Sequence, residues 1–553
     1  MPKKFLGDGF RHAMSAPANA LIDGYFAGRV DRRTFLRQGA IFGLSVSAMG
    51  LLGARADAED APVAVKKGGT LRIGVSTPNG PVDPMKAANQ GSIAMYQPVG
   101  EYLIRAQPDL TLRPFLATEW KSNDKGTVWT FKLRNDVTFQ DGQPMKAADV
   151  VATFNRLADP EGGSIALSAF RGIINSKSAT VIDDYTVQFE LERPVGNFPY
   201  LASSDTYSAI ILPATFKGGF EEAGFPGTGP LKMASYTPTT GATFVRNENY
   251  WDKENLAPLD QVDFVFFADE TPALLALQGG EIDVVYQVSV QNGRAVVNNP
   301  AYKLVGTRSA ASRPLHLRTD TGPWVDKRVR QAFAHTVDRQ AVVQGLMQGY
   351  AEIGNDSCFA PVFPVTDPAV PQRELDLDKA RALLTEAGVP DGFKTTLNVI
   401  NQLEVPAYAV ILQAGAAKVG IDLEIILQDG GTYYGNGQFG TSPWLDSTAG
   451  ITDFGHRSIP NVYLTAQFQS EGVWNSSHLK DAKIDAEIGE FLATVDFEAQ
   501  RKLATSLQEQ FLDLTPTIYS AFLQFIFVTG SNVAGIEPNS SGQLYLGKAG
   551  FIA

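Results

Sequence analysis

Residues 127–160, TVWTFKLRNDVTFQDGQPMKAADVVATFNRLADP, constrain the fold more than any other part of the chain, because they join a strand, two turns and a helix in one run. Trp129, Phe131 and Leu133 occupy every second position at its start. Side chains of a strand alternate between its two faces, so these three residues are predicted to share one buried face. Asn135 and Asp136 then favour a turn.

The second half of this run predicts a short strand, a break and a helix. Residues 137–139 extend as a second strand, and the residues after it are typical of a tight turn. Apolar residues at helical spacing follow and predict a helix with one apolar face, and an Asp-Pro pair at 159–160 ends this helix. The turn residues are Asp141, Gly142 and Pro144, and the apolar face consists of Val150, Val151, Phe154 and Leu157.

The order of these patterns, "F-x-D-G-x-P" followed by "A-x-D-V-V-x-[ST]-F", resembles the family 5 extracellular solute-binding proteins. These are the dipeptide, oligopeptide and nickel receptors of ABC importers. Further stretches of the same resemblance are GTGPLKMASYTPTTGATFVRNENYW at 227–251, ALQGGEIDVVY at 276–286 and RVRQAFAHTVDR at 328–339. The resemblance covers the chain from about Gly68 to its end.

The resemblance implies an α/β fold of the two-lobed periplasmic-binding-protein kind, type II, from the large cluster with an added subdomain, in which helices flank mixed sheets. It implies that residues 57–102, 206–308 and 516–553 build the first lobe. Residues 103–205 form the added subdomain of that lobe, and residues 309–515 form the second lobe.

Several elements follow from local patterns alone. Residues 69–75 alternate as a strand, and residues 94–103 are typical of a helix. Asp338 is placed to cap one helix, and Asp376 or Asp378 another, which Gly388 ends. Residues 395–400, a helix between Pro406 and Gly420, and residues 421–427 form one βαβ unit.

The first 56 residues differ from the rest of the chain. DRRTFLR at 31–37 is followed by an apolar run at 40–53 and by Ala54-Arg55-Ala56, an A-x-A type cleavage site. This resembles a cleaved twin-arginine export leader. The alternative is a membrane anchor, but the run is shorter than the ~20 apolar residues that a spanning helix needs. Because no cysteine stands in the leader, we expect a product without a lipid, retained in a Gram-negative periplasm.

Charge and cysteine content narrow the partners. The chain holds 47 Lys and Arg and 59 Asp and Glu, of which residues 1–56 hold eight and three, so 39 basic and 56 acidic residues remain and leave a net charge of −17. Nucleic acid and anionic lipid surfaces are poor partners for such a protein. The single cysteine, Cys358, excludes an internal disulfide framework.

A search for catalytic patterns favours a binding protein over an enzyme. The five histidines show no H-E-x-x-H or zinc-ligand spacing, and no G-x-S-x-G elbow or Walker A loop occurs. A G-x-G-x-x-G match at 435–440 is followed by Pro443, so no helix is expected there to receive a phosphate. His335 is expected to be a packed helix residue. We predict no cofactor and no metal.

A receptor that closes around a solute gains closure energy only from contacts with both lobes. In the first lobe the resemblance indicates Asn89, Gln90 and Gly91, which match the family segment that meets the ligand backbone. Tyr519 and Gln524 on the C-terminal return are further candidates. Each of these residues has the alternative of a capping or surface role.

The second lobe carries the more specific prediction. Peptide receptors of this family hold a "G-W-x-x-D" segment whose aspartate pairs with the peptide amine. The matching segment here runs from Asp453 to Arg457, with Phe454 in place of the tryptophan and Arg457 in place of the aspartate. An arginine repels an ammonium, so the resemblance implies a solute that presents a carboxylate or another anionic group to Arg457.

Two alternatives stay open at this site. In the first, Arg457 pairs with Asp453 or another local acid and only shapes the pocket. In the second, the alignment to the family segment is shifted by a few residues, and Asp453 anchors an amine of the solute. Tyr433, Tyr434 and Trp444 lie upstream and suit the wall of a ligand pocket, although core packing explains them equally well.

These observations predict a periplasmic solute-binding receptor of an ABC importer of the peptide or opine type. Its solute is a modified peptide, an opine-like conjugate, an oligosaccharide or another polar metabolite, and its protein partner is an inner-membrane permease. We expect a monomer without stable membrane insertion. The alternatives are a secreted enzyme, hydrolytic or cofactor-dependent, and a chemosensory or chaperone-like binder on the same fold.

Overall fold

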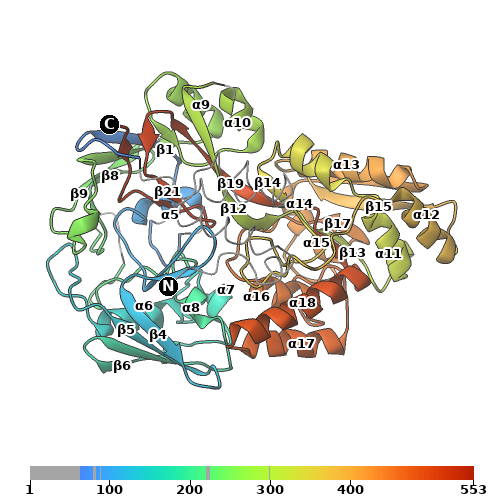
Figure 1. The fold of residues 1–553 in the computed structure, drawn as a ribbon, viewed down its shortest axis with the longest axis horizontal. Coiled ribbons are helices and arrows are strands. Elements are labelled where there is room, and N and C mark those ends of the chain that lie inside the picture. Colours follow the sequence, from blue (N-terminus) through green and yellow to red (C-terminus); the bar gives the residue numbers. More distant parts are fainter. Residues whose placement is uncertain (1–62, 79–81, 88, 219–224, 298) are drawn as a thin grey trace, which may run out of the picture. The chain divides into compact units, whose positions relative to one another are not determined.

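The computed structural model describes residues 63–78, 82–87, 89–218, 225–297 and 299–553. The chain divides into two compact units, Met1–Ala64 with Ile552–Ala553 and Val65–Phe551. The fold described below is that of the second unit (Figure 1). The leader expected at residues 1–56 lies outside the described residues.

Within the described residues, one mixed sheet has eight strands in the order β12-β19-β11-β1-β10-β9-β8, with β14 paired to β19. β1 runs parallel to β10 and β11, and the other pairs are antiparallel. Figure 1 shows β19, in red, beside β12, in green, although more than two hundred residues separate them. The strands are β1 Thr70–Ser76, β8 Leu231–Thr237, β9 Gly241–Arg246, β10 Gln261–Phe267, β11 Val284–Val285, β12 Tyr302–Ser312, β14 Ala351–Ile353 and β19 Ala521–Gly530.

The strand predicted at residues 69–75 is confirmed as β1. Leu71, Ile73 and Val75 are buried on one face, as the alternation requires. The helix α9 (Glu270–Gln278) follows β10. The helices that accompany this sheet are α5 Gln90–Tyr96, α9 and α10 Val290–Val297, with a short 3-10 turn η2 at Lys253–Asn255.

The opening sequence motif builds a second sheet, of four strands in the order β4-β5-β7-β6 in this part of the described chain. Trp129, Phe131 and Leu133 are buried on β5, and the helix predicted after them is α6. Phe154 of α6 packs edge-on against Phe189, with ring centroids 4.9 Å apart. The elements are β4 Ala117–Ser122, β5 Val128–Leu133, β6 Ala179–Asp183, β7 Thr186–Glu190, α6 Ala147–Leu157, α7 Leu167–Phe170 and α8 Phe198–Leu201.

The strand predicted at residues 137–139 is reduced to a single bridge between Thr138 and Pro144. Gly142 turns the chain back with a φ of +88°, and the turn is too tight for a ladder to form. The helix predicted at 94–103 is wrong in position, because α5 ends at Tyr96. Pro98 provides no N–H for a further turn, so the apolar residues beyond it continue the core as irregular chain.

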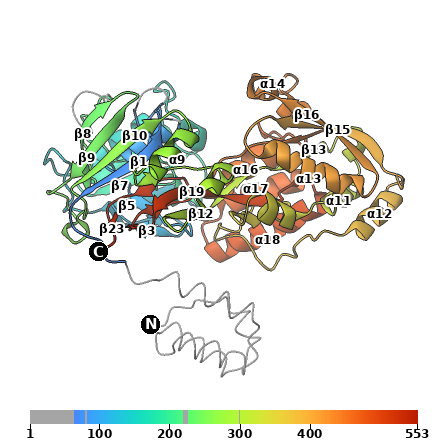
Figure 2. The ribbon, with the colours of Figure 1, turned by 90° about the horizontal axis from the view of Figure 1, so that it is seen from above.

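The third sheet has five strands in the order β16-β15-β17-β13-β18 in the described chain. The predicted βαβ unit is confirmed: β15 runs parallel to β16, and α13 connects them (Figure 2). Pro406 lies in the first turn of α13, and Gly420 turns the chain with a φ of +85°. The strands are β13 Leu315–Leu317, β15 Phe393–Ile400, β16 Ile421–Gln428, β17 Ala449–Ile451 and β18 Thr517–Ile518.

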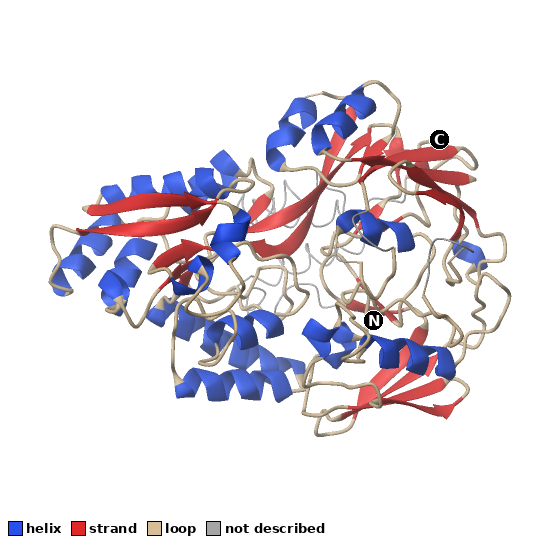
Figure 3. Ribbon diagram, turned by 180° about the vertical axis from the view of Figure 1, so that it is seen from behind, coloured by secondary structure: helices blue, strands red, loops and turns tan. Residues whose placement is uncertain are grey.

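Aspartate caps start several of the helices around this sheet, and Figure 3 shows helices flanking its strands. Asp376 accepts from the Lys379 N–H at 2.9 Å, so the first of the two predicted caps is confirmed. Asp338 accepts from the Ala341 N–H at 2.8 Å and starts a π-helix, η4. The helices are α11 Lys327–Ala334, η4 Ala341–Leu346, α12 Leu377–Glu386, α13 Val405–Ala417, α14 Gly430–Tyr434, α15 Pro443–Asp446, α16 Asn461–Tyr463, η5 Leu464–Phe468, α17 Ala482–Ala493 and α18 Phe497–Leu514, with a 3-10 turn η3 at Gly322–Trp324.

Short paired strands complete the described chain: β2 (Ile104–Ala106) with β3 (Leu112–Pro114), β20 (Val533–Ala534) with β23 (Gly550–Phe551), and β21 (Glu537–Pro538) with β22 (Leu544–Tyr545). Among the helices that the structure describes, none has both the length and the apolar character of a membrane span. The mixed sheets and flanking helices are those of the predicted α/β fold class.

Candidate functional site

Two short loops, one next to β2 and one after β17, form the candidate site. The first, which we call the 203–207 loop, is fixed by backbone and side-chain hydrogen bonds. The Ser204 N–H donates to the Ile104 carbonyl at 2.9 Å, and the Tyr102 hydroxyl donates to the Tyr207 carbonyl at 2.9 Å. Gln543 Nε2 donates to the Ser204 carbonyl at 3.1 Å. These bonds fix the backbone on both sides of Asp205.

The second loop, the 454–458 loop, is anchored on the end of β12. Phe454 and Ser312 exchange both backbone hydrogen bonds, at 2.9 and 3.0 Å. His456 Nδ1 accepts from the Ala310 N–H at 3.0 Å. Burial and, to a smaller extent, the nearby Arg457 charge lower the pKa of His456 to about 3, so the ring is neutral and can accept this bond.

The two loops meet at the side chains of Asp205, Tyr207, Arg457 and Ser458. Burial raises the pKa of Asp205 to about 7, and the hydroxyls of Ser458 and Ser203 beside the carboxylate oppose the rise. Burial also raises the pKa of Tyr207, and the Arg457 charge opposes that shift. Each loop therefore lies within the electrostatic reach of the other, although 250 residues separate them in sequence.

Arg457 is exposed, and its guanidinium is available to a solute. Its Nη1 donates to the neighbouring His456 carbonyl at 2.8 Å. No carboxylate among the described residues lies within ion-pair distance of Arg457. A guanidinium with unused donors next to a neutral histidine can form a bidentate bond with an incoming carboxylate.

Asp453, the predicted alternative partner, pairs with a different arginine. Arg313 Nη1 lies 2.6 Å from Asp453 Oδ1, and Arg313 Nε lies 2.8 Å from Glu404 Oε1. The side chains are 11% exposed for Arg313, 26% for Asp453 and 14% for Glu404. Asp453 therefore neutralises Arg313 and leaves Arg457 unpaired.

The predicted aromatic wall lies beside this Arg313 cluster. Tyr433 is fully buried and donates to the Ile451 carbonyl at 2.7 Å, while Tyr434 is half-buried and lies near Asp453. Trp444 is nearly buried and contacts Tyr434 edge-on, and its indole N–H has no hydrogen-bond partner. Phe454 packs against Trp474 and Tyr463. Solute contacts of these rings stay a prediction.

Asn89, Gln90 and Gly91 form the start of α5. Asn89 is its N-cap and accepts from the Ser92 N–H at 3.0 Å, which is the capping alternative. A side chain on Gly91 would lie 2.0 Å from the Ser76 carbonyl oxygen, so only glycine fits. Gln90 Oε1 lies 3.4 Å from the Tyr286 hydroxyl, which donates to the carbonyl of Gly542, next to Gln543. The structure thus connects Gln90 to the 203–207 loop through the C-terminal segment.

The two C-terminal candidates lie deeper. The Tyr519 hydroxyl donates to Gln467 Oε1 at 2.5 Å inside the core around the five-stranded sheet. Gln524 is half-buried on β19, next to Gly306 of β12. Both positions are explained by packing, and their contact with a solute stays a prediction.

The sequence-based reading did not identify Asp205, Tyr207, Ser458 or Arg313. None of them stands in a recognisable motif. Asp205 follows a run of two serines after α8, and this pattern is typical of an ordinary loop. Its unusual setting depends on Ser458, which only the fold brings beside it.

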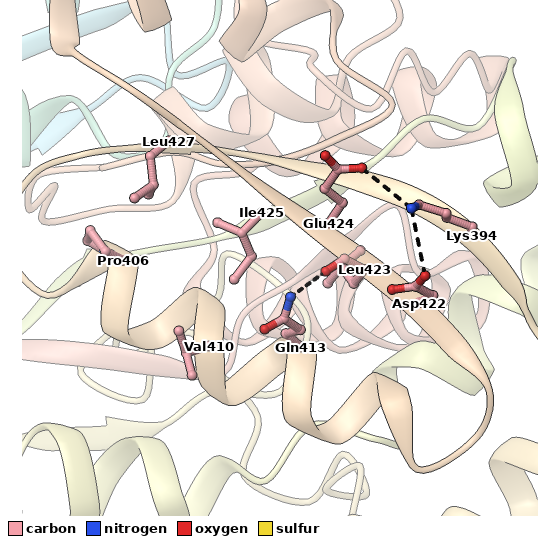
Figure 4. A pocket seen from close by; sticks show the side chains of 9 residues that line it. All are labelled: Lys394, Pro406, Val410, Gln413, Asp422, Leu423, Glu424, Ile425 and Leu427. Carbon is pink, nitrogen blue, oxygen red and sulfur yellow. Dashed lines mark hydrogen bonds and ion pairs between the residues drawn. The ribbon is translucent and has the colours of Figure 1, made fainter.

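A groove of about 500 Å³ lies elsewhere, between α13 and β16 (Figure 4). Its polar lining is already paired, because Lys394 lies 3.8 Å from Glu424 and 4.0 Å from Asp422. Gln413 donates to the Leu423 carbonyl at 2.6 Å. The groove offers a solute no unused charge, so we place the candidate site at the two loops.

The structure assigns no chemistry to the other candidate features. Residues 435–440 precede α15, which has only four residues. His335 is buried and its Nδ1 lies 2.9 Å from the Glu374 carbonyl oxygen. In the described part of the chain, no group of three His, Cys, Asp or Glu is arranged to hold a metal ion.

Comparison with known proteins gives consistent results. The sequence profile described as bacterial extracellular solute-binding proteins, family 5, middle region, matches residues 111–455. The glutathione-binding protein GsiB of Escherichia coli (strain K12) is 25% identical over 471 residues, which are 82% of this chain and 89% of the relative. The solved structure of the periplasmic murein tripeptide binding protein MppA, in its unliganded open form, superposes with a TM-score of 0.78 at 20% identity and covers 89% of this chain and 99% of that one. The binding protein AgaA from A. tumefaciens R10, in complex with agropinic acid, superposes with a TM-score of 0.65 at 23% identity, covering 87% and 99%.

Proposed function

The chain belongs to the bacterial extracellular solute-binding proteins of family 5, and from that membership we propose that it captures a carboxylate-bearing small solute through Arg457. It is a substrate-binding protein of an ABC importer, with the two-lobed fold of its family. The comparisons give no support to the enzyme alternative.

The observation that carries the proposal is the unpaired Arg457. A receptor site for an anion needs a cation that the protein itself does not neutralise. Among the described residues Arg457 fulfils this condition, because Asp453 is engaged by Arg313. Its loop is fixed by three hydrogen bonds to β12, so little conformational entropy is lost when a carboxylate binds.

The relatives' ligands support the same class of solute. Glutathione, a murein tripeptide and agropinic acid all carry carboxylates, and these are the compounds named for the three proteins compared above. The solute of this chain is therefore proposed to be a short modified peptide or an opine-like conjugate. Its partner is proposed to be an inner-membrane ABC permease.

We also propose the cellular context from the sequence. Family members are periplasmic binding proteins. The twin-arginine pattern at residues 31–37 and the A-x-A site at 54–56 support export and cleavage of the leader, and the absence of a cysteine from the leader supports a product without a lipid.

Thermal unfolding of the chain from Asp57 onward tests the proposed function. Glutathione, trialanine and agropinic acid are compared with maltotriose, which carries no carboxylate. We expect saturable stabilisation without turnover by at least one carboxylate compound, because a ligand that binds only the folded state stabilises it by about 2.7 kcal/mol at 100 times its Kd. Stabilisation by maltotriose alone, or steady formation of a product, would contradict the proposal.

A further inference from the structure

Asp205 is a carboxylate without a cation. Its Oδ2 atom is buried and has no hydrogen-bond partner, and no basic side chain in the described chain lies within ion-pair distance of it. The hydroxyls of Ser203 and Ser458, which lie beside it, are neutral. A buried carboxylate of this kind is costly unless a positive charge compensates it.

Apart from Arg457, the basic groups near the two loops, Arg105, Arg313 and His456, do not compensate Asp205. Arg105 lies over the Tyr545 ring, 3.7 Å from its centroid, and pairs with Glu537 at 2.5 Å. Arg313 pairs with Asp453, and His456 is neutral because burial lowers its pKa to about 3. None of these three groups is a counter-ion for Asp205, and in the described chain Arg457 does not lie within ion-pair distance of it either.

The 203–207 loop is not fully enclosed by the protein. Asp205, Thr206 and Tyr207 are each partly exposed. Arg457 influences Tyr207, and Ser458, the residue after Arg457, lies beside the Asp205 carboxylate. An unpaired cation and an unpaired anion thus lie on facing loops that hydrogen bonds hold in place.

We propose that Asp205 receives the ammonium group of the solute whose carboxylate Arg457 binds, so that the substrate class is a zwitterion. The carboxylate half of this inference rests on the proposed function, and the ammonium half rests on Asp205. A zwitterion neutralises both loops at once, whereas a simple anion leaves the Asp205 carboxylate uncompensated. Contacts with both loops also favour the state in which the loops lie together.

Calorimetry with matched pairs of ligands tests the inference. Glutathione and trialanine are each compared with their N-acetylated forms, which keep the carboxylates and lose the ammonium group. We expect at least one zwitterion to bind the native chain at least tenfold more tightly than its N-acetylated form. In the Asp205→Asn variant, which keeps the side-chain volume, the affinity for the zwitterion is expected to fall at least tenfold, while the affinity for the N-acetylated form is unchanged.

The affinity of the zwitterion is also expected to depend on pH. Because the pKa of Asp205 is about 7 before binding and an ammonium stabilises the ionised form, affinity falls by up to tenfold per unit as the pH drops below 7. The groups that face Asp205 are the hydroxyls of Ser203, Ser458, Tyr200 and Tyr545, and beyond Ser458 the ring of His456. None of these has a pKa between 5.5 and 8, so Asp205→Asn is expected to remove this pH dependence.

The outcomes separate this inference from the proposed function. Asp124→Asn, an exposed aspartate after β4, is the matched control and should leave all affinities unchanged. Equal affinity for both members of every pair, tighter binding of the N-acetylated forms, or a full preference for the zwitterion in Asp205→Asn would overturn the inference. Binding of N-acetylated anions that survives Arg457→Ala would instead overturn the proposed function.

Discussion

Replacing Arg457 by alanine is expected to weaken the binding of a carboxylate-bearing solute about 10- to 100-fold, measured by calorimetry. Hydrogen bonds to charged groups contribute about 1.5–3 kcal/mol, and the variant loses the guanidinium that forms them. Since the side chain is exposed and, among the residues that the structure describes, donates only to the adjacent His456 carbonyl, its removal should leave the unfolding transition of the free protein unchanged.

Two further variants sharpen this result. Arg457→Lys keeps the charge but loses the planar pair of donors, so an intermediate affinity is expected. Arg171→Ala removes an exposed arginine at the end of α7, outside the residues assigned to the two loops, and should have no effect. Equal affinities in all three variants would show that Arg457 does not contact the solute.

Replacing Asp356 by asparagine is expected to lower the free energy of unfolding by about 3–5 kcal/mol. Asp356 is completely buried between two arginines, with Oδ1 2.6 Å from Arg339 Nη2 and Oδ2 3.3 Å from Arg373 Nε. The arginine side chains are only 4% and 8% exposed, so the variant leaves two buried charges without compensation. Asparagine tolerates the positive φ of 51° at this position, so the loss reflects charge and not backbone strain.

Urea-induced unfolding measures this effect, with Asp378→Asn as its control. Asp378 also pairs with an arginine, Arg381, but its side chain is 99% exposed. Exposed pairs contribute about 0–1 kcal/mol, so the control should remain close to the native protein. A loss at Asp356 as small as that at Asp378 would contradict the assigned role of the buried cluster.

The parts of the fold that local patterns determine were predicted from the sequence. Alternation in residues 128–133 gave β5, helical spacing gave α6, and the sequence between Phe393 and Gln428 gave a parallel βαβ unit. In each case hydrophobic periodicity and turn chemistry agree with the tertiary environment. The lobe boundaries predicted from the family resemblance stay a prediction.

The errors have equally local causes. The apolar residues 94–103 suggested a helix, but a single proline at 98 ends α5, and the residues beyond it are buried as irregular chain. Alternation at residues 137–139 suggested a strand, yet the turn after it leaves room for one bridge only. Periodicity indicated burial correctly in both segments and gave the wrong backbone conformation.

The candidate site was only partly predictable because its charges are decided by long-range pairing. The sequence indicated Arg457 and Asp453, and it left open whether they pair with each other. The partner of Asp453 is Arg313, 140 residues away, which no local pattern indicates. Two features identify Asp205 as a candidate: it has no counter-ion, and it lies beside Ser458. Both are properties of the folded chain and not of the sequence around Asp205.

The most direct test of the account is a crystal structure of the chain from Asp57 onward with the tightest-binding carboxylate compound. We expect its carboxylate oxygens within 2.7–3.2 Å of the Arg457 guanidinium nitrogens, in a bidentate arrangement. A solute whose carboxylate binds Arg313 or another group, while Arg457 remains in solvent, would contradict the central claim.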